Sequence, residues 1–229
     1  MKTIIVTGAN GNLGTATVKK LLDEGYAVIG ADNAYTHLGF ALNNAGFTFH
    51  AVNLLDEAEA AGFIDTIIKQ HGKIDGALLL VGGFAMGTIE TTTGTDIRKM
   101  YALNFETVYF IARPLFLHMQ QNKYGRLVFV GSRSALQAEQ GKGSLAYSLT
   151  KAMLFKLADL INATAKDMNV TASVLVPSTI DTAINRKNMP NDDPADWVKP
   201  EQLADVLEFI CSDKGSPIRE AVYKVYNNG

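Results

Sequence analysis

Short apolar runs alternate with longer segments of helical periodicity along the whole chain. Seven runs rich in β-branched residues predict strands, at positions 2–7, 27–31, 48–53, 77–81, 126–130, 171–176 and 221–226. Apolar positions recurring every three to four residues predict helices between them, ending near 24 and spanning about 56–71, 96–121, 146–168 and 201–211. This regular alternation predicts an α/β fold with one doubly wound parallel sheet of about seven strands and helices on both faces.

We expect one domain over residues 1–229, because no linker, internal repeat or low-complexity segment divides the chain. The segment from 180 to 199 interrupts the pattern with prolines such as Pro190 and Pro194. It predicts an irregular substrate loop that could close as a mobile lid. Met189 and Trp197 could close on an apolar substrate or could equally anchor the loop by packing.

A glycine-rich turn follows the first predicted strand, with glycines at positions 8, 11 and 14. Strand, glycine turn, helix and strand follow one another within about thirty residues, the arrangement in which such a turn binds a dinucleotide. Glycines let the backbone approach a pyrophosphate, and the helix N-terminus offers free N–H groups. The alternative is a purely structural tight turn.

Asp32 stands just past the second predicted strand. A carboxylate there accepts hydrogen bonds from a ribose 2′-hydroxyl and repels a 2′-phosphate. Asn10 and Asn12 occupy positions where a 2′-phosphate would favour arginine or lysine. The pattern therefore favours NAD(H) over NADP(H), although Asp32 could instead merely begin a polar turn.

Tyr147 and Lys151 lie four residues apart at the start of a long predicted helix. This spacing places both side chains on the same face. An ammonium beside a phenol favours the phenolate and lowers the pKa of the tyrosine, which suits a group that exchanges protons near neutral pH. The non-functional alternative is that Tyr147 is a core aromatic residue and Lys151 a solvated surface lysine.

Other polar and glycine residues follow the remaining strands, and the carboxyl ends of parallel strands meet at one edge of the sheet. The sequence therefore predicts a ligand site at that edge. Its expected members are the glycine turn, Asp32, Asn53, Gly82, Gly83, Ser134 and the segment 177–182.

Composition and charge exclude several classes of binding partner. The net charge is −2, and no basic run exceeds a pair, so a nucleic-acid partner is not expected. No apolar run reaches membrane-spanning length, and the chain opens without a signal-peptide pattern. The one cysteine, Cys211, forms no internal disulfide. We expect a cytoplasmic protein without a membrane partner or a metal site.

These residues together resemble the short-chain dehydrogenase/reductase family over essentially the whole chain, which implies a Rossmann-type fold and an NAD(P)-dependent oxidoreductase. The resemblance implies that Tyr147 is the general acid/base, that Lys151 lowers its pKa and binds the nicotinamide ribose, and that Asn104 holds a water. The serine that polarises the substrate would be Ser134, since it lies thirteen residues before Tyr147, whereas Ser132 does not. The resemblance also assigns cofactor contacts to Gly8, Asn10, Asn12, Leu13, Gly14, Asp32, Asn53, Leu54, Gly82, Gly83, Pro177, Ile180 and Thr182.

The substrate implied is a small carbonyl or alcohol, in a pocket lined by 84–86, 136–138 and the lid. The resemblance further implies a homodimer or homotetramer formed through the helices that carry Asn104 and Tyr147. A finer resemblance, between 181 and 197, is to dihydropteridine reductases, which act on a quinonoid pterin. Those enzymes generally carry a small apolar residue in place of Ser134, so the pterin enzyme remains the alternative.

Two further classes share parts of this pattern. A non-enzymatic dinucleotide-sensing regulator can have the same fold, although such proteins can lose the tyrosine or lysine that this chain retains. A sugar-nucleotide epimerase can have the same glycine spacing. Those enzymes usually carry a larger C-terminal substrate domain, and only 47 residues follow Thr182.

Overall fold

The computed structural model describes residues 1–228, which form one seven-stranded sheet with every strand pair parallel. The strand order β3-β2-β1-β4-β5-β6-β7 confirms the predicted doubly wound α/β fold. The strands are β1 (Thr3–Thr7), β2 (Ala27–Asp32), β3 (Phe47–Ala51), β4 (Gly76–Leu79), β5 (Tyr124–Val130), β6 (Asn169–Pro177) and β7 (Val222–Val225).

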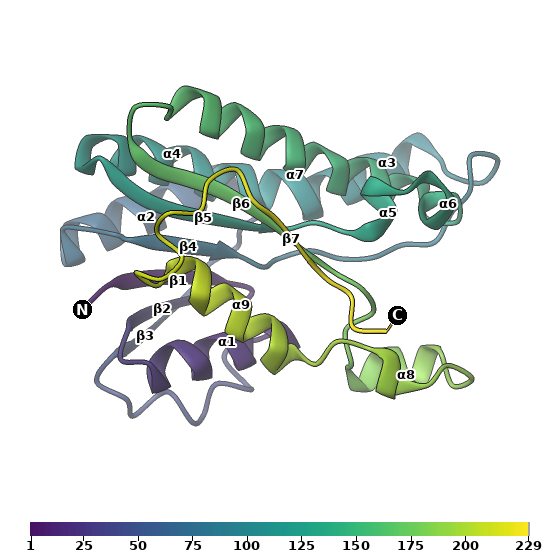
Figure 1. The fold of residues 1–229 in the computed structure, drawn as a ribbon, viewed down its shortest axis with the longest axis horizontal. Coiled ribbons are helices and arrows are strands. Elements are labelled where there is room, and N and C mark those ends of the chain that lie inside the picture. Colours follow the sequence, from purple (N-terminus) through teal and green to yellow (C-terminus); the bar gives the residue numbers. More distant parts are fainter. Residues whose placement is uncertain (229) are drawn as a thin grey trace.

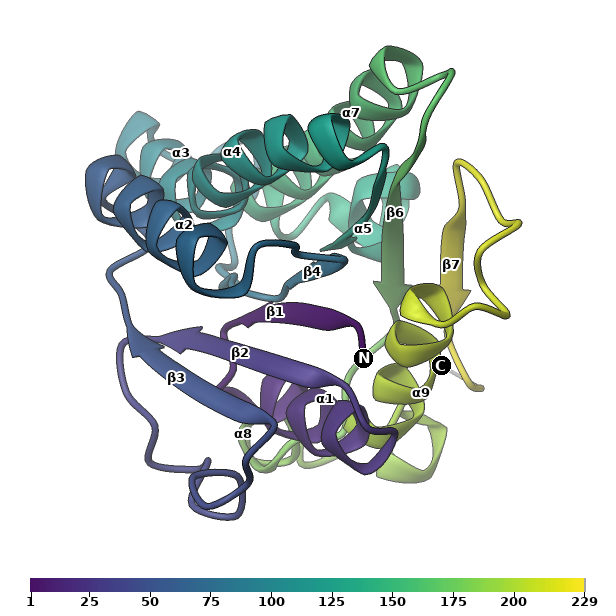
Figure 2. The same cartoon turned by 90° about the vertical axis from the view of Figure 1, so that its left-hand side faces the viewer.

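Helices cover both faces of the sheet (Figure 1). On one face lie α2 (Glu57–His71), α3 (Gly94–Tyr101), α4 (Thr107–Asn122) and α7 (Leu145–Thr164). On the other face α1 (Asn12–Asp23) and α9 (Pro200–Cys211) lie side by side, as Figure 2 also shows. The shorter helices are α5 (Arg133–Leu136), α6 (Ala138–Gly141), α8 (Ala183–Asn188) and a 3₁₀ turn at Pro194–Asp196.

The five inner strands have side chains in two separate cores, because successive residues point to opposite faces. Ile5 packs with α2, α4 and α7, whereas its neighbours Ile4 and Val6 pack with α1 and α9. Leu127 and Phe129 repeat this division around Val128 in β5. Continuous apolar strands are therefore buried on both sides, as the sequence predicts.

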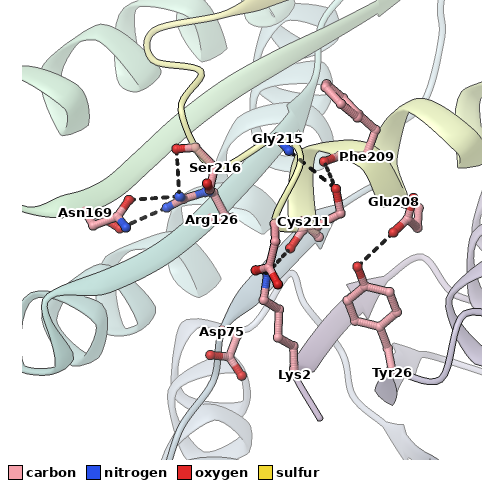
Figure 3. Close-up of polar contacts among 12 residues, drawn as sticks. Lys2, Tyr26, Asp75, Arg126, Asn169, Glu208, Phe209, Cys211, Gly215 and Ser216 are labelled. Atoms are coloured by element: carbon pink, nitrogen blue, oxygen red, sulfur yellow. Dashed lines mark hydrogen bonds and ion pairs between the residues drawn. The ribbon is translucent and has the colours of Figure 1, made fainter.

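At the amino edge of the sheet, polar contacts attach the C-terminal part of the chain to the core strands (Figure 3). The buried Arg126 side chain donates hydrogen bonds from its two η nitrogens to both oxygens of Asn169 and to the Ser216 carbonyl. Lys2 donates to the Cys211 carbonyl at 2.8 Å, and Tyr26 donates to Glu208 at 2.8 Å. This edge is thus closed by internal hydrogen bonds.

The predicted helix over 96–121 is divided in the structure. α3 leads into a π-helical segment, Ala102–Glu106, and then into α4, which contains Pro114. Such wide turns often occur at functional sites, and this one contains Asn104.

The prediction of an irregular 180–199 segment is wrong in part, because the segment contains α8 and the 3₁₀ turn. Thr182 caps α8, and an Arg186–Asp181 ion pair supports it. Trp197 is buried, which favours its role as a packing residue. Lid motion stays a prediction. No helix within residues 1–228 is long and apolar enough to cross a membrane.

Candidate active site at the carboxyl edge of the sheet

A cavity of about 500 Å³ lies where β5 and β6 end, beside α5, α6 and α8 at the right-hand side of Figure 1. Tyr147 and Ser132 line it together with apolar side chains, including Phe84, Met86 and Met189. The ring of Phe84 meets the Tyr147 ring edge-on, with 5.0 Å between centroids. The phenol thus lies in a mostly apolar wall.

Tyr147 and Lys151 come together from successive turns of α7, as their spacing predicts. The Lys151 ammonium lies 5.9 Å from the centre of the Tyr147 ring and donates a hydrogen bond to the Val130 carbonyl at 2.8 Å. Its side chain is buried, and burial lowers the pKa of Lys151 to about 8. The alternative of a solvated surface lysine is therefore wrong.

The sequence predicts that Lys151 lowers the pKa of Tyr147, and the structure does not show this effect. Burial raises the pKa of Tyr147, and the opposing influence is a hydrogen bond with Ser132 rather than the lysine charge. The ammonium lies beside the ring and donates to a backbone carbonyl. Sequence spacing shows that two groups share a helix face, but it does not show the desolvation that dominates here.

The burial of Lys151 predicts a specific pH dependence of stability. Unfolded chain keeps this lysine protonated up to its ordinary pKa of 10.5, whereas the folded protein releases the proton near pH 8. The free energy of unfolding should therefore rise relative to Lys151→Met by about 2 kcal/mol between pH 7 and pH 9.5. Urea denaturation of both proteins measures this difference. Lys156→Met, which replaces an exposed lysine, is the control. If the difference in free energy of unfolding from the unchanged protein were independent of pH for both variants, the lowered pKa of Lys151 would be contradicted.

Two serines follow β5, and the structure distinguishes them. Ser132 caps α5 and accepts a hydrogen bond from the Ser134 backbone N–H at 3.2 Å. The two hydroxyls are 2.7 Å apart, and the Ser132 hydroxyl is the one that acts to lower the pKa of Tyr147. The thirteen-residue spacing selects Ser134, which stays a prediction, and the structure places Ser132 in the same cavity. Both serines line the cavity.

Asn104 is fully buried in the π-helical segment and connects the end of β4 to α7. Its side-chain oxygen accepts from the Gly83 N–H at 2.8 Å, and its amide nitrogen donates to the Thr150 hydroxyl at 3.3 Å. A Cβ on Gly82 would lie 2.8 Å from that oxygen and 3.1 Å from the Lys151 ammonium. The structure thus brings Gly82, Gly83, Asn104 and Lys151 together, while the water-holding role of Asn104 stays a prediction.

The glycine turn fits a dinucleotide. Gly8 has φ of +67°, and a Cβ on Gly14 would lie 2.0 Å from the Gly8 carbonyl oxygen. The turn therefore needs glycine at both positions to pass closely into α1. A cavity of about 670 Å³ lies against it, lined by Asn10, Gly11, Asn12 and Asp32 among others. Leu13 packs against the core on the α1 face.

Asp32 ends β2 and faces this cavity. Its carboxylate accepts from the backbone N–H groups of Asn10 at 3.0 Å and Asn33 at 2.7 Å. Asp32 also lines a small adjoining hollow with Asn53 and Leu54, where an adenine would be expected. These three residues therefore lie together, as the sequence predicts.

Of the remaining predicted cofactor contacts, two line the cavity and one does not. Pro177 and Ile180 line the cavity beside Tyr147, whereas Thr182 is not among its lining residues and instead accepts from the Asn185 N–H as the cap of α8. The expected lining by 136–138 is not found either, and Gln140 and Ser144 take that place. Asn185 and Gln140 lie in short helices whose position had no sequence signal.

Comparisons with known proteins agree with this arrangement. The profile of the family described as short chain dehydrogenase matches residues 2–193. The 3-oxoacyl-[acyl-carrier-protein] reductase MabA of Mycobacterium tuberculosis is 28% identical, with 98% of this chain and 91% of the relative covered. The 2,3-dihydro-2,3-dihydroxybenzoate dehydrogenase of Escherichia coli is 23% identical, with 95% and 92% covered. Among solved structures, ElxO with NADP bound has a TM-score of 0.89 at 19% identity, with 98% and 96% covered.

The finer resemblance to dihydropteridine reductases is not supported by these matches, whereas the family is shown by the profile alone. The glycine turn, the buried lysine beside a phenol, and the matched length describe the same protein class. The chain belongs to the short-chain dehydrogenase/reductase family and is an NAD(P)-dependent oxidoreductase.

Proposed function

We propose that the protein transfers hydride between NAD(H) and a small carbonyl or alcohol, with Tyr147 as the acid/base. The observation that carries this proposal is the position of the Tyr147 phenol, which lines a cavity with Ser132 and lies beside the buried ammonium of Lys151. The two named relatives support the substrate class, because one is a 3-oxoacyl reductase and the other a dehydrogenase of a diol.

Each side chain of the site has a separate role in the proposed reaction. When bound, the nicotinamide supplies or accepts the hydride. Ser132 donates a hydrogen bond to the carbonyl oxygen, and Tyr147 delivers its proton to that oxygen as negative charge develops there. Lys151, protonated below about pH 8, holds positive charge beside the phenol and binds the ribose. Asn104 keeps the end of β4 and α7 in register, and the glycine turn binds the pyrophosphate.

The experiment is NADH consumption by the purified protein with a panel of aldehydes, ketones, a 3-oxoacyl thioester and quinonoid dihydropterin. We expect turnover of at least one carbonyl compound. Turnover of the pterin alone would replace this proposal with the pterin reductase. NADH binding without turnover of any panel member would favour a dinucleotide-sensing protein.

We also propose that NAD(H) is preferred over NADP(H), since the Asp32 carboxylate faces the cavity beside the glycine turn. Asp32→Ala combined with Asn33→Arg should shift the ratio of kcat/KM values for NADH and NADPH toward NADPH at least about tenfold. Asn33→Ala alone is the control. Equal use of both cofactors by the unchanged protein would contradict the role of Asp32.

A homo-oligomer formed through α4 and α7 is a further proposal. These helices expose apolar side chains on their outer surfaces, including Leu117, Leu149 and Leu160. Large exposed apolar surfaces favour association between copies. Light scattering after size-exclusion chromatography should give the mass of two or four chains, and the mass of one chain at micromolar concentration would contradict the proposal.

A further inference from the structure

The substrate cavity contains a single formally charged side chain among its lining residues, that of Arg133. The remaining lining consists of apolar, aromatic, hydroxyl and amide groups with backbone, and it includes no acidic residue. A cation among the lining residues, with no anion there to offset it, favours a positive potential in this cavity. The proton-transfer chemistry proposed above does not use this charge.

Arg133 is held in place without being neutralised. Its guanidinium carbon lies 4.8 Å from the centre of the Tyr226 ring, and its Nε is buried without a hydrogen-bond partner. Within residues 1–228 the structure has no hydrogen bond or ion pair from this side chain to another residue. Arg126 differs, because both its η nitrogens donate to protein oxygens (Figure 3).

Two carboxylates stand next to cavity-lining residues in the sequence, and both are paired with other cations. Glu139 of α6 pairs with Lys142, and Asp181 pairs with Arg186 at 2.6 Å. Neither residue lines the cavity. A stacked guanidinium with free nitrogens is well suited to bidentate binding of a planar carboxylate, and stacking reduces the side-chain freedom lost on binding.

Arg133 lies next to a residue of the proposed reaction site. It follows Ser132 directly at the start of α5, and the backbone carbonyl of Tyr226, whose ring it contacts, accepts a hydrogen bond from the Ser178 hydroxyl at 2.7 Å. Ser178 also lines the cavity. Arg133 thus lies where β5, β6 and β7 end, and it lines the same cavity as Ser132.

We infer that Arg133 selects carbonyl substrates that carry a carboxylate, binding that group while Ser132 and Tyr147 engage the reducible oxygen. The apolar side chains of Phe84, Met86 and Met189 contact the part of the substrate between these two ends. The inference rests on the proposed function for the reaction, but recognition of the anion is a separate property of the cavity. Its substrates are small oxo-acids with an apolar middle.

Matched substrates test this selection. With saturating NADH, kcat/KM for 4-formylbenzoate should exceed that for methyl 4-formylbenzoate at least about tenfold. In Arg133→Gln the ratio should fall to near one, with kcat/KM for the ester within about twofold of the unchanged protein. Arg133→Lys should retain part of the preference, and Lys187→Gln, which removes an exposed cation of α8 outside the cavity, should retain all of it. An unchanged ratio in Arg133→Gln, or weaker NADH binding as its main effect, would overturn the inference.

A binding measurement separates this inference from the proposed reaction. Benzoate and benzamide are titrated into the enzyme–NADH complex, and the change in NADH fluorescence reports binding without turnover. Benzoate should bind at least about tenfold more tightly than benzamide, and Arg133→Gln should remove the difference. Equal binding of the two by the unchanged protein would overturn anion recognition even if hydride transfer occurs. Selective benzoate binding would support it even if neither aldehyde is reduced.

Discussion

Tyr147→Phe is expected to lower kcat by about 10³-fold while leaving the Kd for NADH within about twofold, because it removes the proton donor and keeps the ring. The phenyl ring retains its edge-on contact with Phe84, so the cavity wall should persist. Steady-state kinetics with the best carbonyl substrate measures the first quantity, and a fluorescence titration with NADH measures the second.

Tyr124→Phe is a matched control at the opposite end of β5, away from the cavity that Tyr147 lines. It should keep kcat within about twofold. Full activity in Tyr147→Phe would show that another group supplies the proton. A comparable loss of NADH binding in that variant would indicate a structural role for the hydroxyl instead.

Ser132→Ala is expected to lower kcat by about 10²-fold, and Ser134→Ala by less than about fivefold. The difference follows from their positions, since Ser132 interacts with Tyr147 whereas Ser134 contacts the Ser132 hydroxyl at 2.7 Å. We therefore propose that Ser132 polarises the substrate oxygen and that Ser134 orients the Ser132 hydroxyl. Steady-state kinetics of the two variants measures the contrast.

The two variants also control for each other, because both lose one hydroxyl from the same short segment. Circular dichroism should confirm that each folds like the unchanged protein. A larger loss of kcat in Ser134→Ala would restore the assignment that the thirteen-residue spacing gives. Similar losses in both would mean that the hydroxyl pair acts as one unit.

The strands and the ligand edge could be predicted because their signals are local and repeated. Most strands are continuous apolar runs, and the alternation of strands and helices predicts that the sheet is parallel. Asp32 ends β2 and Gly83 lies four residues after the end of β4, so the parallel sheet places them at the same edge. Tyr147 and Lys151 needed only the spacing of one helix.

Features that depend on short helices or on burial could not be predicted from the sequence. α5, α6 and α8 have four to six residues each, too few for a helical period, so the path from β5 to Tyr147 was not foreseen. Sequence spacing therefore could not show that both Ser132 and Ser134 line the cavity, or that Thr182 caps α8. Desolvation of Lys151 depends on tertiary packing, which a single sequence does not show.

The central claim is that the Tyr147 phenol, with the Lys151 ammonium beside it, is where the proton and hydride meet. A crystal structure with NADH bound tests it most directly. The account predicts the nicotinamide C4 in the cavity facing the Tyr147 hydroxyl, the ribose hydroxyls within hydrogen-bonding distance of Lys151 Nζ, and the pyrophosphate on the glycine turn. A nicotinamide bound away from Tyr147, or a Lys151 side chain turned to solvent, would contradict it.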